Sequence, residues 1–151
     1  MLDFMAKAWE KNQDILREAY RDIAILSGDC YYEGLTYEDI LYFIIHFLLN
    51  GGDGRNGEWD EERIHCIDDG SYQGTLLFLA ARKGYEPAAS DYFITAVGYG
   101  SCSGCDTLMA ANELDDCVEK RVDTYMMLSL HMIQRAKMPF DAEIEWEGES
   151  W

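Results

Sequence analysis

The sequence predicts a single α+β domain over residues 1–140, followed by an acidic tail over residues 141–151. Three observations lead to this class. Apolar residues recur at three- and four-residue intervals near both ends of the domain, which is the spacing of amphipathic helices. Short segments between them have a strand-like composition, and their connections are too short for parallel crossovers. The expected order is therefore two helices, a three-stranded antiparallel sheet and two more helices.

Two helices are expected before the sheet. The first covers residues 2–26, has acids and bases on its polar face, and ends at residues 27–29. Its apolar positions are Met5, Ala8, Trp9, Leu16, Ala19, Tyr20, Ile23 and Leu26. Thr36 and Asp39 form a capping box that opens a second helix, which runs to Leu49. This helix is apolar almost all round, so we expect it at the centre of the core.

The sheet and two further helices are expected next. The three strands cover residues 63–67, 75–81 and 92–99. A turn of small residues over 100–106, here called the cysteine turn, leads into a short helix over 107–112. A long amphipathic helix begins at about Leu114 and is closed by Pro139.

The chain carries a large negative charge for its length. Its 151 residues have a formal net charge of -17, yet 48% are hydrophobic, which is enough apolar material for a core. Net charge affects partners and solubility more than fold, so we expect it to serve binding, with simple solubility as the alternative. The 12 basic residues form no cluster that would neutralise phosphates, which argues against direct binding of nucleic acid or an anionic membrane.

The sequence also indicates a compartment. The amino terminus has no recognisable secretory signal, and the longest apolar run, residues 40–49, is too short to span a bilayer. Five cysteines, an odd number without framework spacing, suit a reducing environment. A soluble, cytoplasmic protein is therefore expected.

The acidic tail alternates acidic with neutral side chains. In an extended chain this alternation places the carboxylates on one edge, roughly 6 to 7 Å apart, a spacing comparable to that of phosphates along a nucleic-acid strand. The acids are Asp141, Glu143, Glu145, Glu147 and Glu149. Their apolar partners Ile144, Trp146 and Trp151 either dock on the domain as an added edge strand or anchor a partner protein. A floppy, solubilising terminus is the remaining alternative.

The cysteine turn is the most distinctive local sequence. Cys102 and Cys105 have the spacing of half a zinc site, but a second pair of ligands is missing. They could instead be a redox dithiol, with the pKa of Cys102 lowered by the following helix. The favoured interpretation is structural: the glycines make a sharp turn, the cysteines are small buried hydrophobes, and Asp106 caps the helix. No metal or cofactor is therefore expected.

The run Tyr99-Gly100-Ser101-Cys102-Ser103-Gly104-Cys105-Asp106 resembles a motif that recurs in small, mostly uncharacterised proteins of bacteriophages and prophages. The resemblance covers residues 91–110 and, more loosely, residues 70–74. It implies a phage origin, and with it the cytoplasm of a bacterial host, but it brings no activity with it.

Other candidates for chemistry are weak. The three histidines allow no convincing Ser–His–Asp or Cys–His arrangement, and His46 is expected to be a core residue. The glycine-rich residues 51–54 lack the Lys-Ser/Thr ending of a phosphate-binding loop. We therefore expect no enzyme activity.

Together these observations favour an acidic inhibitor that mimics nucleic acid. It would occupy the basic surface of a host defence protein that binds nucleic acid, such as a CRISPR effector or a restriction enzyme. Carboxylates would stand in for phosphates, with Trp146 as an apolar anchor. The expected partner-binding acids are Asp60, Glu61, Glu62, Asp115, Asp116, Glu119, Asp141, Glu143, Glu145, Glu147 and Glu149. The alternatives are a zinc- or thiol-dependent protein centred on Cys102 and Cys105, and a phage structural or assembly component. The oligomeric state stays open.

Overall fold

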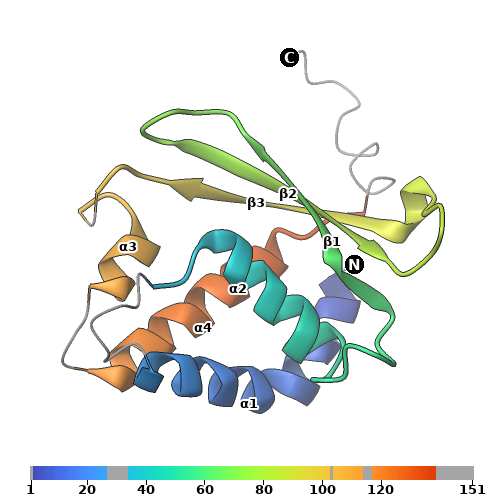
Figure 1. The fold of residues 1–151 in the computed structure, drawn as a ribbon, viewed down its shortest axis with the longest axis horizontal. Helices are drawn as coiled ribbons and strands as arrows, with labels where there is room; N and C mark the ends of the chain where they lie inside the picture. The colour runs from blue at the N-terminus through green and yellow to red at the C-terminus, as the bar shows by residue number, and fades with distance from the viewer. Residues whose placement is uncertain (1, 27–33, 103, 114–116, 139–151) are drawn as a thin grey trace.

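A computed structural model describes residues 2–26, 34–102, 104–113 and 117–138. The fold is α+β, with a sheet on one side of a layer of helices (Figure 1). The helices are α1 (Leu2–Leu26), α2 (Tyr37–Phe43), the π-helix η1 (Ile44–Leu49), the 3-10 helix η2 (Ala89–Asp91), α3 (Thr107–Asn112) and α4 (Val118–Gln134). The strands are β1 (Trp59–Asp68), β2 (Gly74–Arg82) and β3 (Tyr92–Tyr99). The α+β class is thereby confirmed.

The strands form an antiparallel meander in the order β1–β2–β3, as their short connections predicted. β1 begins at Trp59, earlier than expected, and its register with β2 shifts between Trp59 and Ile64. Such an irregularity bends a strand and redirects its side chains. The start of β1 therefore lies outside the regular ladder, and it carries the acids Asp60, Glu61 and Glu62.

The second helix is not the single α-helix that we expected. Its capping box is present, but α2 ends at Phe43 and the chain continues as a π-helix. The N–H of Asn50 donates to the Ile45 carbonyl at 2.9 Å, an i to i−5 bond. Asn12 of α1 donates from Nδ2 to the Leu48 carbonyl at 2.8 Å, in a buried position. A contact with another helix thus accompanies the wider turn. The apolar periodicity of the sequence does not predict such a long-range contact.

The core lies between the sheet and the helices, where α1 packs against α4 and η1. On the sheet its largest side chains are Trp59, Phe78 and Phe93. The Tyr20 hydroxyl of α1 shares a 2.6 Å hydrogen bond with Ser129 Oγ of α4, and burial raises the pKa of Tyr20. The phenol therefore stays protonated and ties the two helices together.

The chain after α4 returns to the sheet. Lys137 forms an isolated antiparallel bridge with Ile94 on the edge of β3 that faces away from β2, with both backbone N···O distances at 2.8 Å. The acidic tail of residues 141–151, and with it the expected edge strand, lies outside the described residues. Within the described part of the chain, no helix has the length and apolar character needed to cross a bilayer.

Candidate functional site

A groove of about 620 Å³ runs between α1 and the joined helices α2 and η1. In Figure 1, α1 lies along the base of the helical layer and α2 descends toward it. The groove is lined on the α1 side by Asp14, Ile15, Glu18, Ala19, Asp22 and Ile23, and on the other side by Tyr42, Phe43, His46 and Phe47. The lining contains three acids and neither lysine nor arginine.

The α1 side of the groove is acidic because three carboxylates recur at every fourth residue. Residues four apart in an α-helix lie on one face, so Asp14, Glu18 and Asp22 form one line, here called the acidic edge. All three side chains are exposed. None of them takes part in the ion pairs found among the described residues.

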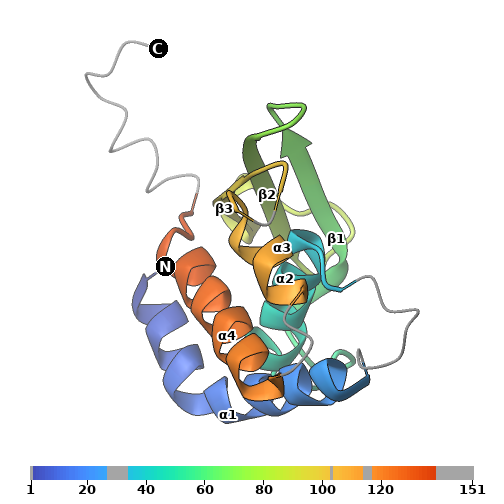
Figure 2. The ribbon, with the colours of Figure 1, turned by 90° about the vertical axis from the view of Figure 1, so that its left-hand side faces the viewer.

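The opposite edge of α1 is neutralised by α4, which lies alongside it (Figure 2). Arg17 pairs with Asp123 at 2.7 Å, and Arg21 pairs with Glu119 at 3.0 Å; this is the paired edge. The hydrogen bond to Glu119 is the main cause that raises the pKa of Arg21, and the charges of Glu18 and Asp22 in the acidic edge make smaller contributions. The arginines of α1 are thus directed toward α4 and away from the groove.

The far wall of the groove is aromatic. Tyr42 and His46 stack with ring centroids 5.8 Å apart and planes 7° from parallel, and Phe43 and Phe47 meet edge to face at 5.4 Å. Tyr42 is 38% exposed, and Ile15 on the facing helix is 41% exposed. Large apolar side chains therefore remain accessible to a ligand in the groove.

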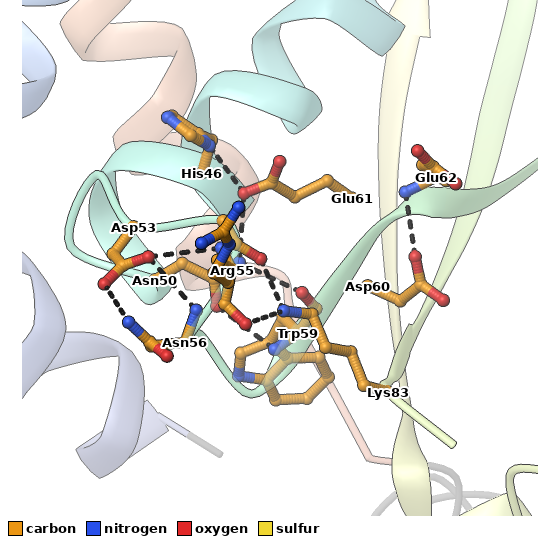
Figure 3. A network of polar contacts seen from close by, with 11 residues as sticks. His46, Asn50, Asp53, Arg55, Asn56, Trp59, Asp60, Glu61, Glu62 and Lys83 are labelled. Carbon is orange, nitrogen blue, oxygen red and sulfur yellow. Dashed lines mark hydrogen bonds and ion pairs between the residues drawn. The ribbon is translucent and has the colours of Figure 1, made fainter. Parts of the chain in front are cut away.

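A polar network behind the aromatic wall holds His46 in place (Figure 3). His46 Nδ1 lies 2.5 Å from Glu61 Oε1, and both side chains are largely buried. Asn50 Nδ2 donates to Glu61 Oε1 at 3.2 Å and to the Trp59 carbonyl at 3.0 Å, while its Oδ1 accepts from the Trp59 N–H at 3.1 Å. Asn50 thus joins the end of η1 to the start of β1, and Glu61 fixes the histidine ring against its aromatic neighbours.

Four of the acids predicted from the sequence lie within the described residues, and the structure does not direct these four to one surface. Figure 3 shows Glu61 turned toward His46, whereas Asp60 and Glu62 lie away from that ring. Asp60 pairs with Arg63 at 3.2 Å, and Glu119 of α4 pairs with Arg21 of the paired edge. Of the four that are described, only Glu62 is exposed without an ion pair. The others lie outside the described residues, and they are Asp115, Asp116, Asp141, Glu143, Glu145, Trp146, Glu147 and Glu149.

The cysteine turn differs from its expected structure in one respect. Asp106 caps α3, as predicted, by accepting from the Met109 N–H at 3.0 Å. The prediction that Cys102 and Cys105 are buried is wrong, because both are exposed. A hydrogen bond from the Cys102 thiol is the chief cause that lowers the pKa of Cys105.

A second cleft, of about 440 Å³, adjoins the cysteine turn. Its lining comes from the start of α2, the helix-facing side of the sheet, and α3. Tyr37 donates to Asp106 at 2.9 Å, and Tyr99 donates to Asp68 at 2.6 Å, which raises the pKa of Tyr99 to about 12. Both tyrosine hydroxyl protons are therefore already donated to carboxylates of the protein.

Neither the donor sets nor the comparisons with known proteins point to a cofactor. No three His, Cys, Asp or Glu side chains gather into a possible metal site within the part of the chain that the structure describes. No protein family, curated protein or solved structure matches this chain. Within the described residues, the groove is the best-defined candidate site, because it combines an acidic edge with exposed aromatic side chains.

Sequence reasoning missed this groove, although part of the signal is visible. The four-residue spacing of Asp14, Glu18 and Asp22 predicts an acidic line on the first helix. The spacing does not reveal what these acids face. The aromatic wall opposite them comes from residues 42–47, which are distant in sequence.

Proposed function

We propose that this protein binds a basic, amphipathic helical segment of another protein in the groove between α1 and α2–η1, and that it inhibits a nucleic-acid-binding protein by doing so. The observation that supports this proposal most directly is the acidic edge, which makes no ion pair within the described residues, facing an aromatic wall across one groove. A ligand that satisfies both sides must be cationic and apolar at once.

An amphipathic helix with lysine or arginine beside its apolar stripe has this combination. Its apolar residues would lie against Ile15, Tyr42 and the phenylalanines, as in other helix-in-groove complexes. Its cationic groups would reach the acidic edge, and their methylene stems would cover apolar surface. The aromatic faces also favour cations, by about 0.5–1 kcal/mol at exposed sites.

Basic segments of this kind are common in proteins that bind nucleic acid, because they neutralise phosphates. Occupying such a segment would block the phosphate-binding surface, which agrees with the acidic inhibitor expected from the formal charge of -17. A host defence protein such as a CRISPR effector or a restriction enzyme remains our proposed target class. The acidic tail could add further carboxylates to the same interface.

Binding is tested with a labelled lysine–leucine peptide of about 18 residues, or five helical turns, whose leucines occupy one helical face. A second peptide has the same composition in an order that gives no apolar face. Fluorescence anisotropy measures both affinities at low and moderate salt. We expect the amphipathic peptide to bind more tightly and to weaken as salt rises. Equal affinities of the two peptides would show that only net charge determines binding, and would contradict the proposal that the groove binds an amphipathic helix.

Matched charge variants locate the site. D14K/E18K/D22K reverses the acidic edge, and E58K/E86K/E113K makes the same change in net charge at exposed positions away from the groove. Only the first variant should lose peptide binding. Inhibition is then measured in cleavage reactions of a Cas9-type effector and a restriction endonuclease. A variant that keeps inhibition but loses peptide binding would separate the inhibitor proposal from the groove.

A further inference from the structure

The cysteine turn brings two exposed thiols together without burying them. Cys102 Sγ and Cys105 Sγ lie 3.0 Å apart, and both residues are exposed. We propose that Cys102 and Cys105 are a redox-active pair that forms a reversible intramolecular disulfide by exchange with a low-molecular-weight disulfide. This inference does not depend on the proposed groove, because the two sites share no residue.

Hydrogen bonds within the turn hold the two cysteines close to each other. The N–H groups of Cys105 and Asp106 both donate to the Cys102 carbonyl, at 3.0 and 2.9 Å. The Cys102 N–H also donates to Cys105 Sγ at 3.3 Å. A disulfide has an S–S distance of about 2.05 Å, so the sulfur atoms have to approach by only about 1 Å.

A buried carboxylate holds the base of the turn. Asp106 is 5% exposed, and it accepts from the Gly100 N–H at 2.9 Å on one side of the turn and from the Met109 N–H at 3.0 Å on the other. The Tyr37 hydroxyl of α2 donates to the same carboxylate at 2.9 Å. The two ends of the turn are thus fixed to each other and to the body of the protein.

Gly100 allows the close approach of Cys105. A Cβ atom at residue 100 would lie 2.6 Å from the Cys105 carbonyl oxygen and 2.7 Å from Cys105 Sγ. Contacts this short force one of the groups to move, so even alanine would displace the second cysteine. The glycine therefore positions the thiol as well as forming the turn.

The two thiols have different expected roles. The hydrogen bond from the Cys102 thiol lowers the pKa of Cys105 below that of an ordinary cysteine, so we assign Cys105 as the attacking thiol. By contrast, the pKa of Cys66 on β1 is raised, first by burial and then by the nearby charges of Glu38 and Asp68. Cys66 is exposed as well, so it serves as an internal comparison for reactivity.

The exchange balances as two successive substitutions at sulfur. The Cys105 thiolate attacks one sulfur of the small disulfide, whose S–S bond breaks and releases one thiolate. Cys102 then loses its proton to solvent and attacks Cys105 Sγ, which expels the second thiolate and closes the protein disulfide. The protein loses two protons and two electrons, and the small disulfide is reduced to two thiols. Excess small thiol reverses both steps.

Mixtures of oxidised and reduced glutathione test the proposal on the full chain. Unreacted thiols are alkylated with N-ethylmaleimide after an acid quench, and the protein is examined by intact mass and peptide mapping. We expect the Cys102 and Cys105 thiols to be lost together, with a mass decrease of two hydrogens and no retained glutathione. Thiols that stay alkylatable, or that each keep a glutathione, would overturn the proposal.

Single variants identify the order of attack. C102S should accumulate glutathione on Cys105, whereas C105S should react more slowly at Cys102; equal rates would contradict the assignment of Cys105 as the attacking thiol. C66S, the matched control, should close the pair as the parent does. Zinc supplied alone to the reduced protein should not protect the pair, and stoichiometric protection of both thiols would show a metal site instead.

G100A tests the positioning directly, since both thiols remain. A misplacement of about 1 Å slows an oriented intramolecular reaction by roughly ten- to a hundredfold, so closure should slow by that factor while initial adduct formation changes little. Far-UV circular dichroism checks that the variant is folded. Closure at the parent rate in the folded variant would show that the turn geometry does not control the reaction.

Discussion

The two long edges of α1 differ in how their charges are used. On the paired edge, each arginine lies within 3.0 Å of a carboxylate on α4. On the acidic edge, three carboxylates face a groove whose lining has neither lysine nor arginine. The same helix therefore has one edge whose charge is satisfied within the fold and one whose charge is directed to the outside.

The difference shows that stability alone does not explain the acidic edge. Like charges four residues apart destabilise a helix by about 0.2–0.5 kcal/mol for each pair. The paired edge gains little more than this, because exposed ion pairs contribute about 0.2–1 kcal/mol each. The three acids of the acidic edge therefore lower the stability of the helix only slightly. We expect them to contribute to the affinity for a cationic ligand.

Reversing the acidic edge should have the largest effect. In D14K/E18K/D22K, three attractive rim charges become repulsive, and at about 1 kcal/mol each they weaken the lysine–leucine peptide by roughly a hundredfold. The reversal E119K/D123K changes the α4 partners of the paired edge, and it should leave affinity within about threefold and lower stability slightly. Anisotropy and urea unfolding measure the two quantities. Similar affinity losses in both variants would mean that the edges do not differ in function.

Removing one aromatic side chain should have the next largest effect. Y42A deletes an exposed ring of the groove wall, and loss of an aromatic anchor typically weakens binding by about 1–2 kcal/mol, or roughly tenfold. The matched control Y85A removes a tyrosine that is 93% exposed and away from the groove. Thermal unfolding of both variants shows whether the groove is intact. Unchanged peptide affinity in Y42A would show that the aromatic wall does not contribute to binding and that the acidic edge acts by charge alone.

Much of the architecture could be predicted from local sequence. Short connections between strand-like segments predicted the antiparallel sheet, and Thr36 and Asp106 act as helix caps through hydrogen bonds to residues three positions away. These features depend on neighbours in the chain, so a local pattern contains the necessary information.

The site could not be predicted in the same way, because it depends on distant partners. Arg17 and Asp123 are 106 positions apart, so no local pattern reveals that this arginine is turned away from the acids beside it. The π-helix is likewise accompanied by a contact from Asn12 to Leu48, and Glu61 pairs with His46 where the register of β1 with β2 shifts. The net charge could be counted from the sequence. The sequence did not show which carboxylates form ion pairs within the fold and which face the groove.

Lowering the pH should remove the stability that the Arg21–Glu119 ion pair contributes, and we expect this effect to be smaller than those of the groove variants. The hydrogen bond from Arg21 lowers the pKa of Glu119 below its ordinary value of 4.5. A carboxyl with a lowered folded-state pKa adds stability above the unfolded pKa and loses it as the pH falls through the folded pKa. The stability difference between the parent and E119Q should therefore shrink as the pH falls from 7 to below 4. A constant difference in urea titrations over this range would show that the ion pair contributes nothing.

Removing the acidic tail should have the smallest effect on peptide binding if the groove is the primary site. A chain ending at residue 140 keeps the acidic edge and the aromatic wall, so the lysine–leucine peptide should bind within about threefold, which is near the limit of one exposed charge contact. Reversal of the five tail acids to lysine, a larger perturbation, tests the nucleic-acid mimic in the cleavage assays. Loss of inhibition with intact peptide binding would assign phosphate mimicry to the tail and helix capture to the groove. Loss of peptide binding on truncation, together with normal binding by D14K/E18K/D22K, would instead move the whole function to the tail, and the contrast between the two edges of α1 would then have no functional meaning.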